Sequence, residues 1–246
     1  MKKMKIQTLT CLLAICTLLL TSCETECETV TTKNITVLID ATDSLLIHKA
    51  KHELRKENFE HLIGQELGLE ESPKCFTVNY DFGIISTQSY YNPTSTALSH
   101  TDWGQARNKL VIGWRDFYAS HEKNLQSLDS VGLMESTSLF PTLMKAINKT
   151  EGTIIVVSDL IENNPAVNFY KNPPATPEQM DMAYDKMVQY YLPDRLLQKE
   201  KREVIFVVIS EPKNDAVVHK ARAFWKYTLE ENLGLRVSFT DGISTL

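Results

Sequence analysis

The stretch NITVLIDATDSLLIHKA, residues 34–50, decides the expected fold. Its apolar run ends abruptly at Asp40, and Thr42, Asp43 and Ser44 follow before a helical pattern begins. A short β-branched run without polar alternation is typical of a strand that is covered on both faces. A strand that leads straight into a helix indicates an α/β unit. The four oxygen-bearing side chains at the junction indicate either a helix cap or a cation site.

The rest of the chain repeats this alternation. Strands are predicted at 75–80, 84–91, 153–159, 203–210 and 235–241, and helices at 45–67, 102–128, 139–148, 180–191 and 215–232. The runs 75–80 and 84–91 flank Gly83 and predict a hairpin, which places one antiparallel strand at an edge. The remaining connections require right-handed crossovers. We therefore expect an α/β fold with a mostly parallel, doubly wound (Rossmann-like) sheet and helices on both faces.

The first 22 residues indicate the signal peptide of a bacterial lipoprotein. Lys2, Lys3 and Lys5 precede an apolar stretch that is too short for a comfortable membrane span. Its end, LLLTSC, resembles a lipobox, which implies cleavage before Cys23 and lipidation of that cysteine. An ordinary secretory signal cut near the same place is the alternative. The expected location is the cell envelope, with a lipid anchor in a bacterial membrane. We expect this membrane to be the outer membrane. Whether the protein faces the periplasm or the cell surface is left open.

The segment after the proposed cleavage site is polar. Residues 23–33, CETECETVTTK, are acidic and threonine-rich, which predicts a disordered tether and a folded domain over 34–246. Cys27 and Cys75 are the cysteines left to pair once Cys23 is lipidated. An oxidising compartment allows this bridge, but Cys27 lies in the tether, so the pairing is left open.

Charge bears on the class of partner. Removal of the signal peptide takes away three lysines and no acidic residue, which leaves 23 basic and 31 acidic residues. Nucleic acid is therefore not an expected partner, because phosphate binding needs a concentrated positive face.

Two carboxylates that are distant in the sequence are expected at one edge of the sheet. Asp40 ends the first strand and Asp159 ends TIIVVSD, and ligands of such sheets collect beyond the carboxyl ends of the strands. Thr137, before the helix at 139–148, adds a hydroxyl. Hydroxyls together with carboxylates suit Mg²⁺, a hard cation that takes six oxygen ligands. Ser44 suits the N-cap of the following helix and Asp43 suits a helix N-terminus, but capping does not account for the two strand-end carboxylates.

These three loops resemble the metal-ion-dependent adhesion site of the von Willebrand factor A domain. In that family the first strand ends in Asp-x-Ser-x-Ser, a second loop supplies a threonine and a third strand ends in aspartate. DATDS fits with Thr42 in place of serine, and TSLFPTL fits the second loop from Thr137 onward. The departures are Glu135 and Ser136 where glycines are common, Ser158 where threonine is frequent, and Leu160 where glycine is frequent.

The resemblance implies a von Willebrand A-like domain with a bound Mg²⁺, or else Mn²⁺ or Ca²⁺. Ser44 and Thr42 would be direct ligands, Thr137 would join in some states, and Asp40 and Asp159 would act directly or through water. A carboxylate of a protein partner would complete the coordination. The implied function is a lipid-anchored binding module and not an enzyme. The partner and the oligomeric state are left open.

Two alternative functions use the same residues. Asp40 and Asp159 would hold the ion of a metal-dependent phosphoester hydrolase, or the site would be a vestige in a scaffold subunit of an envelope complex. An aspartyl nucleophile at Asp40 normally has a second aspartate two residues later, where Thr42 stands. His48 and His52 have the spacing of a zinc pair but no third ligand, and they indicate a solvated helix face.

Overall fold

The computed structural model describes residues 30–67, 75–85, 93–100, 107–131, 136–191 and 202–243. The predicted signal peptide, Cys23 and Cys27 lie outside these ranges. The described strands are β1 (Thr31–Asp40), β2 (Phe76–Ile85), β3 (Thr94–His100), β4 (Thr153–Ser158), β5 (Glu203–Val208) and β6 (Arg236–Thr240). The described α-helices are α2 (Ser44–Glu53), α3 (Lys56–Leu67), α4 (Arg107–Ser127), α5 (Leu139–Lys149), α6 (Pro177–Tyr191) and α7 (Asp215–Tyr227).

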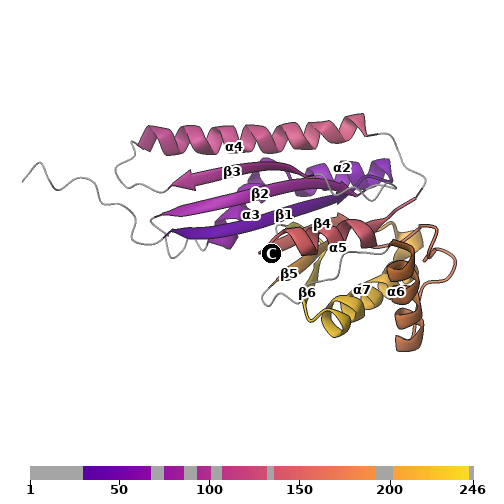
Figure 1. The fold of residues 1–246 in the computed structure, drawn as a ribbon. Helices are drawn as coiled ribbons and strands as arrows, with labels where there is room; N and C mark the ends of the chain where they lie inside the picture. The colour runs from indigo at the N-terminus through magenta and orange to yellow at the C-terminus, as the bar shows by residue number, and fades with distance from the viewer. Residues whose placement is uncertain are drawn as a thin grey trace, which may run out of the picture.

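The six strands form one sheet in the order β3-β2-β1-β4-β5-β6 (Figure 1). All neighbouring strands are parallel except β2 and β3, which are antiparallel. From β1 the chain builds outward through β2 to β3, and then returns to add β4, β5 and β6 on the other side. The direction of winding therefore switches between β1 and β4, where doubly wound sheets open a crevice. The predicted fold class is confirmed.

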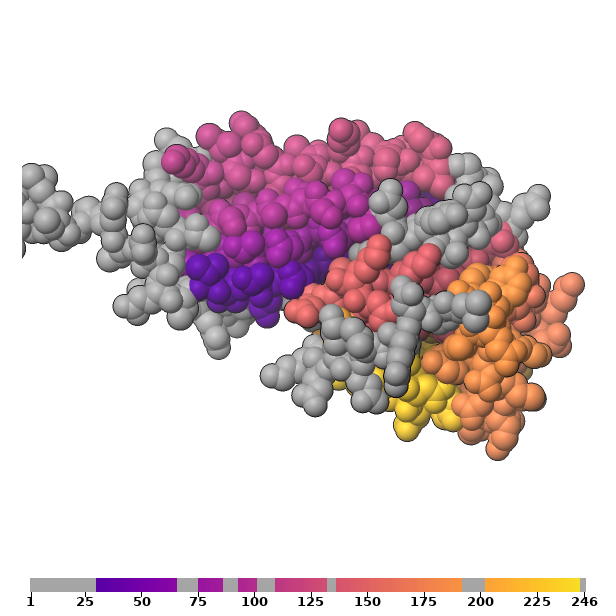
Figure 2. Space-filling model, in the orientation of Figure 1, coloured from indigo at the N-terminus to yellow at the C-terminus, as the bar shows by residue number. Residues whose placement is uncertain are grey.

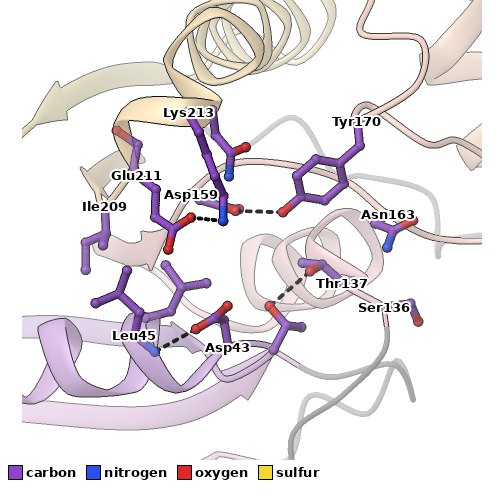
Figure 3. A pocket seen from close by; sticks show the side chains of 14 residues that line it. Asp43, Leu45, Ser136, Thr137, Asp159, Asn163, Tyr170, Ile209, Glu211 and Lys213 are labelled. Atoms are coloured by element: carbon purple, nitrogen blue, oxygen red, sulfur yellow. Dashed lines mark hydrogen bonds and ion pairs between the residues drawn. The ribbon is translucent and has the colours of Figure 1, made fainter.

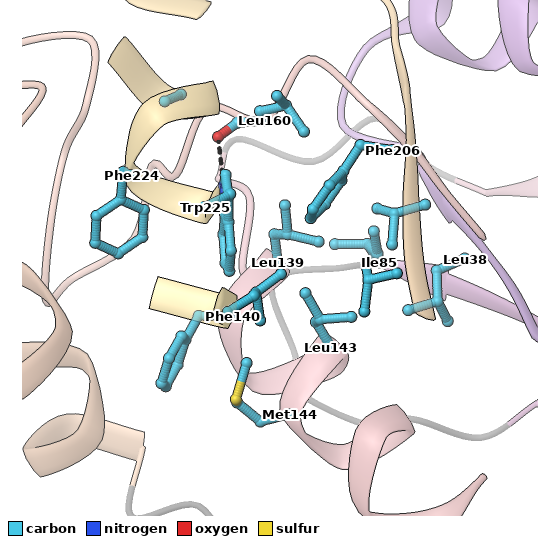
Figure 4. Close-up of a cluster of buried hydrophobic side chains, with 14 of the residues drawn as sticks. Leu38, Ile85, Leu139, Phe140, Leu143, Met144, Leu160, Phe206, Phe224 and Trp225 are labelled. Carbon is cyan, nitrogen blue, oxygen red and sulfur yellow. Dashed lines mark hydrogen bonds between the residues drawn. The ribbon is translucent and has the colours of Figure 1, made fainter. Parts of the chain in front are cut away.

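Helices cover both faces of the sheet. Side chains alternate between the two faces along each strand, so each strand contributes to both apolar layers. Leu38 and Phe206 belong to an apolar layer with α5, α6 and α7, part of which is drawn in Figure 4. Val37 and Ile155 belong to a second layer with α2, α3 and α4. In the space-filling view, α4 and the C-terminal elements lie on opposite sides of the molecule (Figure 2). Among the described helices, none is both long and apolar enough to cross a bilayer.

The helix predicted over 45–67 is two helices. Its break lies at Leu54, whose side chain is fully buried and whose N–H donates to the carbonyl of Ala50. The side chain of Asn58 in α3 donates to the carbonyl of Glu53 at 2.9 Å, so a free carbonyl at the end of α2 is satisfied from the next helix. A tertiary turn of this kind leaves the apolar period almost unchanged, and the sequence pattern did not reveal it.

The predicted hairpin exists, but its strands were misplaced. β2 runs straight through Gly83 to the fully buried Ile85, and its antiparallel partner is β3, in which Thr96 lies opposite Tyr80. Gly83 is therefore an interior strand residue opposite Leu38 of β1 and not a turn. Residues 86–91 of the predicted second strand lie outside the described part of the chain.

The predicted tether is too long at its C-terminal end. Residues 31–33 belong to β1 and pair with residues 76–78 of β2, because the strand ladder satisfies the backbone of these polar residues. Nearby, Cys75 is disulfide-bonded to a cysteine outside the described residues. At the other end of the chain, Gly234 has the positive φ of 67° expected at the end of a helix.

Candidate functional site

A pocket of about 400 Å³ opens at the carboxyl edge of the sheet (Figure 3). Its walls are the loops after β1, β4 and β5 and the segment before α5, so it lies at the switch point where ligands of such folds bind. Leu45, Leu46 and Ile209 form an apolar side. The polar lining residues are Thr42, Asp43, Ser136, Thr137, Asp159, Asn163, Tyr170, Ser210, Glu211, Lys213 and Asn214.

Asp40 lies beneath the pocket, fully buried at the end of β1. Its Oδ1 accepts hydrogen bonds from the backbone N–H and the hydroxyl of Thr42, at 3.1 and 2.6 Å. Its Oδ2 accepts a hydrogen bond from the Ser158 hydroxyl at 2.9 Å. Burial raises the pKa of Asp40, and the hydrogen bonds from Thr42 and Ser158 oppose that rise. The carboxylate therefore joins the end of β1 to the end of β4.

Thr137 brings a third loop to the same point. Its hydroxyl donates to the hydroxyl of Thr42 at 3.2 Å, so a chain of hydrogen bonds runs from Thr137 through Thr42 to Asp40. The backbone of Thr137 pairs with Asn163 in an isolated antiparallel bridge, with N···O distances of 3.0 and 3.4 Å. The loop after β4 therefore positions the threonine that precedes α5.

Asp159 lines the pocket and is 8% exposed. Its Oδ1 accepts a hydrogen bond from the N–H of Ile161 at 2.9 Å, and its Oδ2 accepts one from the hydroxyl of Tyr170 at 3.2 Å (Figure 3). Burial, and then the negative charge of Asp40, raise the pKa of Asp159 to about 7. The two hydrogen bonds to its carboxylate oppose this rise.

Ser44, the fifth predicted ligand, does not line the pocket. It is exposed on the first turn of α2. The preceding residue, Asp43, is extended (φ −133°, ψ 143°) and accepts a hydrogen bond from the N–H of Leu45 at 2.6 Å. Asp43 is therefore the helix cap that Ser44 was expected to provide. The predicted ligands Thr42, Thr137 and Asp159 meet in the pocket above Asp40.

Sequence reasoning missed two residues of this region. Glu162 is fully buried, and burial raises its pKa to about 8. Tyr170 is 48% exposed and points its hydroxyl at Asp159. Both follow β4 in a segment that the sequence presents as irregular and rich in asparagine and proline. The one sequence signal for Glu162 was its position directly after two apolar residues, Leu160 and Ile161.

The charges around the pocket suit a cation. Within the described part of the chain, no lysine or arginine forms an ion pair with Asp40, Asp159 or Glu162. Lys213 lines the pocket, but it is paired with Glu211 at the surface. The described residues also hold no cluster of three His, Cys, Asp or Glu side chains arranged as metal ligands. A cation bound here would therefore rely on threonine hydroxyls, Asp159 and water, a ligand set that suits a hard ion.

Comparison of the chain with protein family models and with curated proteins found no match.

Proposed function

We propose that this chain is a binding module that recognises a carboxylate of a protein partner through a divalent cation. The ion is Mg²⁺, or else Mn²⁺ or Ca²⁺. The observation that carries the proposal is the pocket at the switch point, where Thr42 and Thr137 meet Asp159 above the buried Asp40. The resemblance of the three loops to the adhesion site of von Willebrand factor A domains supports it, because the strand order places those loops together.

The hydrogen bonds of the site indicate which residues would hold the ion. The hydroxyls of Thr137 and Thr42, which lie 3.2 Å apart, would hold the ion, and Asp159 would provide the charge at the pocket wall. Asp40 acts through Thr42 or through water, because both of its oxygens already accept hydrogen bonds. Ser44 is the weakest member of the set, because it is exposed and does not line the pocket. The remaining coordination positions would be taken by water and by the partner's carboxylate.

The proposal includes a lipid anchor at Cys23 in the cell envelope, so the partner is an envelope or surface protein. The excess of acidic residues supports a protein partner over nucleic acid. It also favours an ion-bridged contact, because a bound cation offsets repulsion between an acidic module and the partner's acidic side chain.

An enzymatic function, phosphoester hydrolysis around the same ion, has less support. Asp40 is fully buried and its oxygens accept three hydrogen bonds, so it is poorly placed either to hold a catalytic ion directly or to attack a substrate. A panel of phosphomonoesters and phosphodiesters with Mg²⁺ and Mn²⁺ tests this alternative. Metal-dependent turnover that disappears in Asp40→Ala would favour the hydrolase over the binding module.

A thermal melt of the purified protein with and without millimolar Mg²⁺ or Mn²⁺ tests the cation site. The unfolded chain cannot assemble three distant loops, so binding at 100 times the dissociation constant adds about 2.7 kcal/mol to stability. For a chain of this size, the melting temperature would rise by roughly 5 °C or somewhat more. Asp159→Ala and Thr42→Val should abolish the rise, whereas Thr42→Ser should keep it because the hydroxyl remains. A wild-type protein without a metal-dependent rise would instead support a scaffold subunit with a vestigial site.

A further inference from the structure

The N-terminus of α5 is capped by a residue from another loop. Ser138 occupies the cap position, but its hydroxyl makes no cap bond and lies 3.2 Å from the hydroxyl of Tyr191. The backbone N–H of Phe140 instead donates to the carboxylate of Glu162. The next residue, Pro141, has no N–H to satisfy. A buried side chain from another loop thus accepts from a free N–H group in the first turn of the helix.

Glu162 is itself held firmly. It is fully buried, and its second oxygen accepts a hydrogen bond from the side chain of Asn164 at 2.6 Å. The side-chain oxygen of Asn164 accepts in turn from the N–H groups of Ala166 and Val167, at 2.9 and 3.0 Å. The loop after β4 therefore folds around this carboxylate, which ties the loop to the helix start.

Two bridges consequently connect the same pair of segments. One is the backbone bridge between Thr137 and Asn163, and the other runs from Glu162 to the first turn of α5. Asn163 directly follows Glu162, and Thr137 lies two residues before Leu139. Asp159 stands three residues before Glu162 in the same loop. The separation of Thr137 from Asp159 is thus set by this double connection.

We propose that Glu162 is the positioning residue of the pocket, which holds Thr137 in place relative to Asp159 so that both can contact one divalent cation. This inference rests on the proposed cation site. Glu162 does not line the pocket, so it would not touch the ion. Outer partners that orient ligands typically affect metal affinity by about 10- to 100-fold when they are removed. Loss of Glu162 therefore weakens the cation through Thr137 and not through lost charge at the ion.

The test compares Glu162→Ala with a variant that destabilises α5 elsewhere. Ile147→Ala is the matched control, because Ile147 is 3% exposed near the other end of α5 and far from the lining residues. The dissociation constant for Mn²⁺ is measured with the purified full-length protein at 10 °C, where circular dichroism confirms that every variant is folded. We expect binding at least 10-fold weaker in Glu162→Ala and within twofold of wild type in Ile147→Ala.

Amide hydrogen exchange of the metal-free proteins gives a second, independent readout. Thr137 and Asn163 should lose protection in Glu162→Ala but keep it in Ile147→Ala. Unchanged protection in Glu162→Ala, or unchanged Mn²⁺ affinity in that variant, overturns the proposal and leaves Glu162 as a cap only. Failure of the wild type to bind Mn²⁺ overturns the proposed function instead, and the exchange data still decide whether Glu162 positions Thr137.

Discussion

Leu160, directly after Asp159, has a backbone conformation that favours glycine. Its φ is 68°, the only positive φ of a non-glycine residue in the described part of the chain. Its side chain is fully buried, and its carbonyl accepts a hydrogen bond from the indole N–H of Trp225 at 3.0 Å (Figure 4). Such strain costs of order 1–3 kcal/mol and persists only where the surroundings hold it. Packing and the Trp225 hydrogen bond thus hold the loop that carries Asp159.

The strain at Leu160 predicts an unusual order of variant stabilities. Leu160→Ala removes buried side-chain atoms, which costs about 2–5 kcal/mol, and keeps the left-handed backbone. Leu160→Gly removes slightly more of the buried side chain, but it relieves roughly 1 kcal/mol of backbone strain, because glycine adopts a positive φ without a clash. We expect wild type to be most stable, then Leu160→Gly, then Leu160→Ala, measured by urea unfolding. An alanine variant at least as stable as the glycine variant would contradict backbone strain at this residue.

The candidate site was predictable to different degrees at individual residues. Asp40 and Asp159 could be placed together, because each ends an apolar strand and parallel strands present the same ends at one edge. Tyr170 and Glu162 could not be placed, because their contacts depend on how an irregular loop folds back. Asp43 and not Ser44 caps α2, since a sequence does not say which of two adjacent polar residues becomes the cap.

At the scale of elements, the alternation of strands and helices was predictable and their exact limits were not. Apolar runs such as TIIVVSD are distinct because β4 is buried along its whole length. The break between α2 and α3 and the passage of β2 through Gly83 depend on tertiary contacts, a hydrogen bond from Asn58 and pairing with β1. The local sequence pattern does not predict either contact.

The loop after β4 carries two carboxyl groups that predict how metal-free stability depends on pH. The pKa is raised from 3.8 to about 7 for Asp159 and from 4.5 to about 8 for Glu162, mainly by burial. The folded state therefore keeps protons that the unfolded state has lost, so stability falls as pH rises through these values. Buried His121, whose pKa is lowered to about 4, acts in the opposite direction but only below about pH 6.5. The informative window is pH 6.5 to 8.5.

In that window, the unfolding free energy of the metal-free protein should fall by about 2–3 kcal/mol. Urea unfolding in the presence of a chelator measures this fall. Asp159→Asn and Glu162→Gln should each flatten the curve, because neither replacement titrates. A metal-free stability that does not fall between pH 6.5 and 8.5 would show that the two groups are already ionised in the folded state.

At the scale of the whole molecule, the disulfide at Cys75 closes the edge of the sheet opposite the pocket. Cys75 directly precedes β2, and its carbonyl accepts a hydrogen bond from the N–H of Thr31 at the start of β1, at 3.0 Å. Signal cleavage would remove Cys11 and Cys16, and lipidation would consume Cys23, so Cys27 is the expected partner. Peptide mapping of the non-reduced protein should recover Cys27 linked to Cys75. Reduction should lower the unfolding free energy by about 2–4 kcal/mol, and a different link would remove the case for lipidation at Cys23.

The position of the pocket relative to β1 gives the lipid anchor a direction. Eight residue steps separate Cys23 from Thr31, a reach of at most about 28 Å in an extended chain. β1 then runs for 10 residues to Asp40, about 33 Å at the usual rise per residue. With the proposed lipid at Cys23, the pocket would therefore open at the end of the sheet that points away from the membrane, where it could meet a partner in the aqueous phase.

Cys23→Ala separates anchoring from binding. The variant should move from the membrane fraction to the soluble fraction in cell fractionation, because the thiol that carries the lipid is gone. Its metal-dependent melting shift should match wild type, since the pocket lies at the far end of β1. Asp159→Ala should behave in the opposite way, staying with the membrane and losing the shift. A Cys23→Ala protein that stays in the membrane fraction would contradict the anchor, and the proposed cation site would be judged on the melting shift alone.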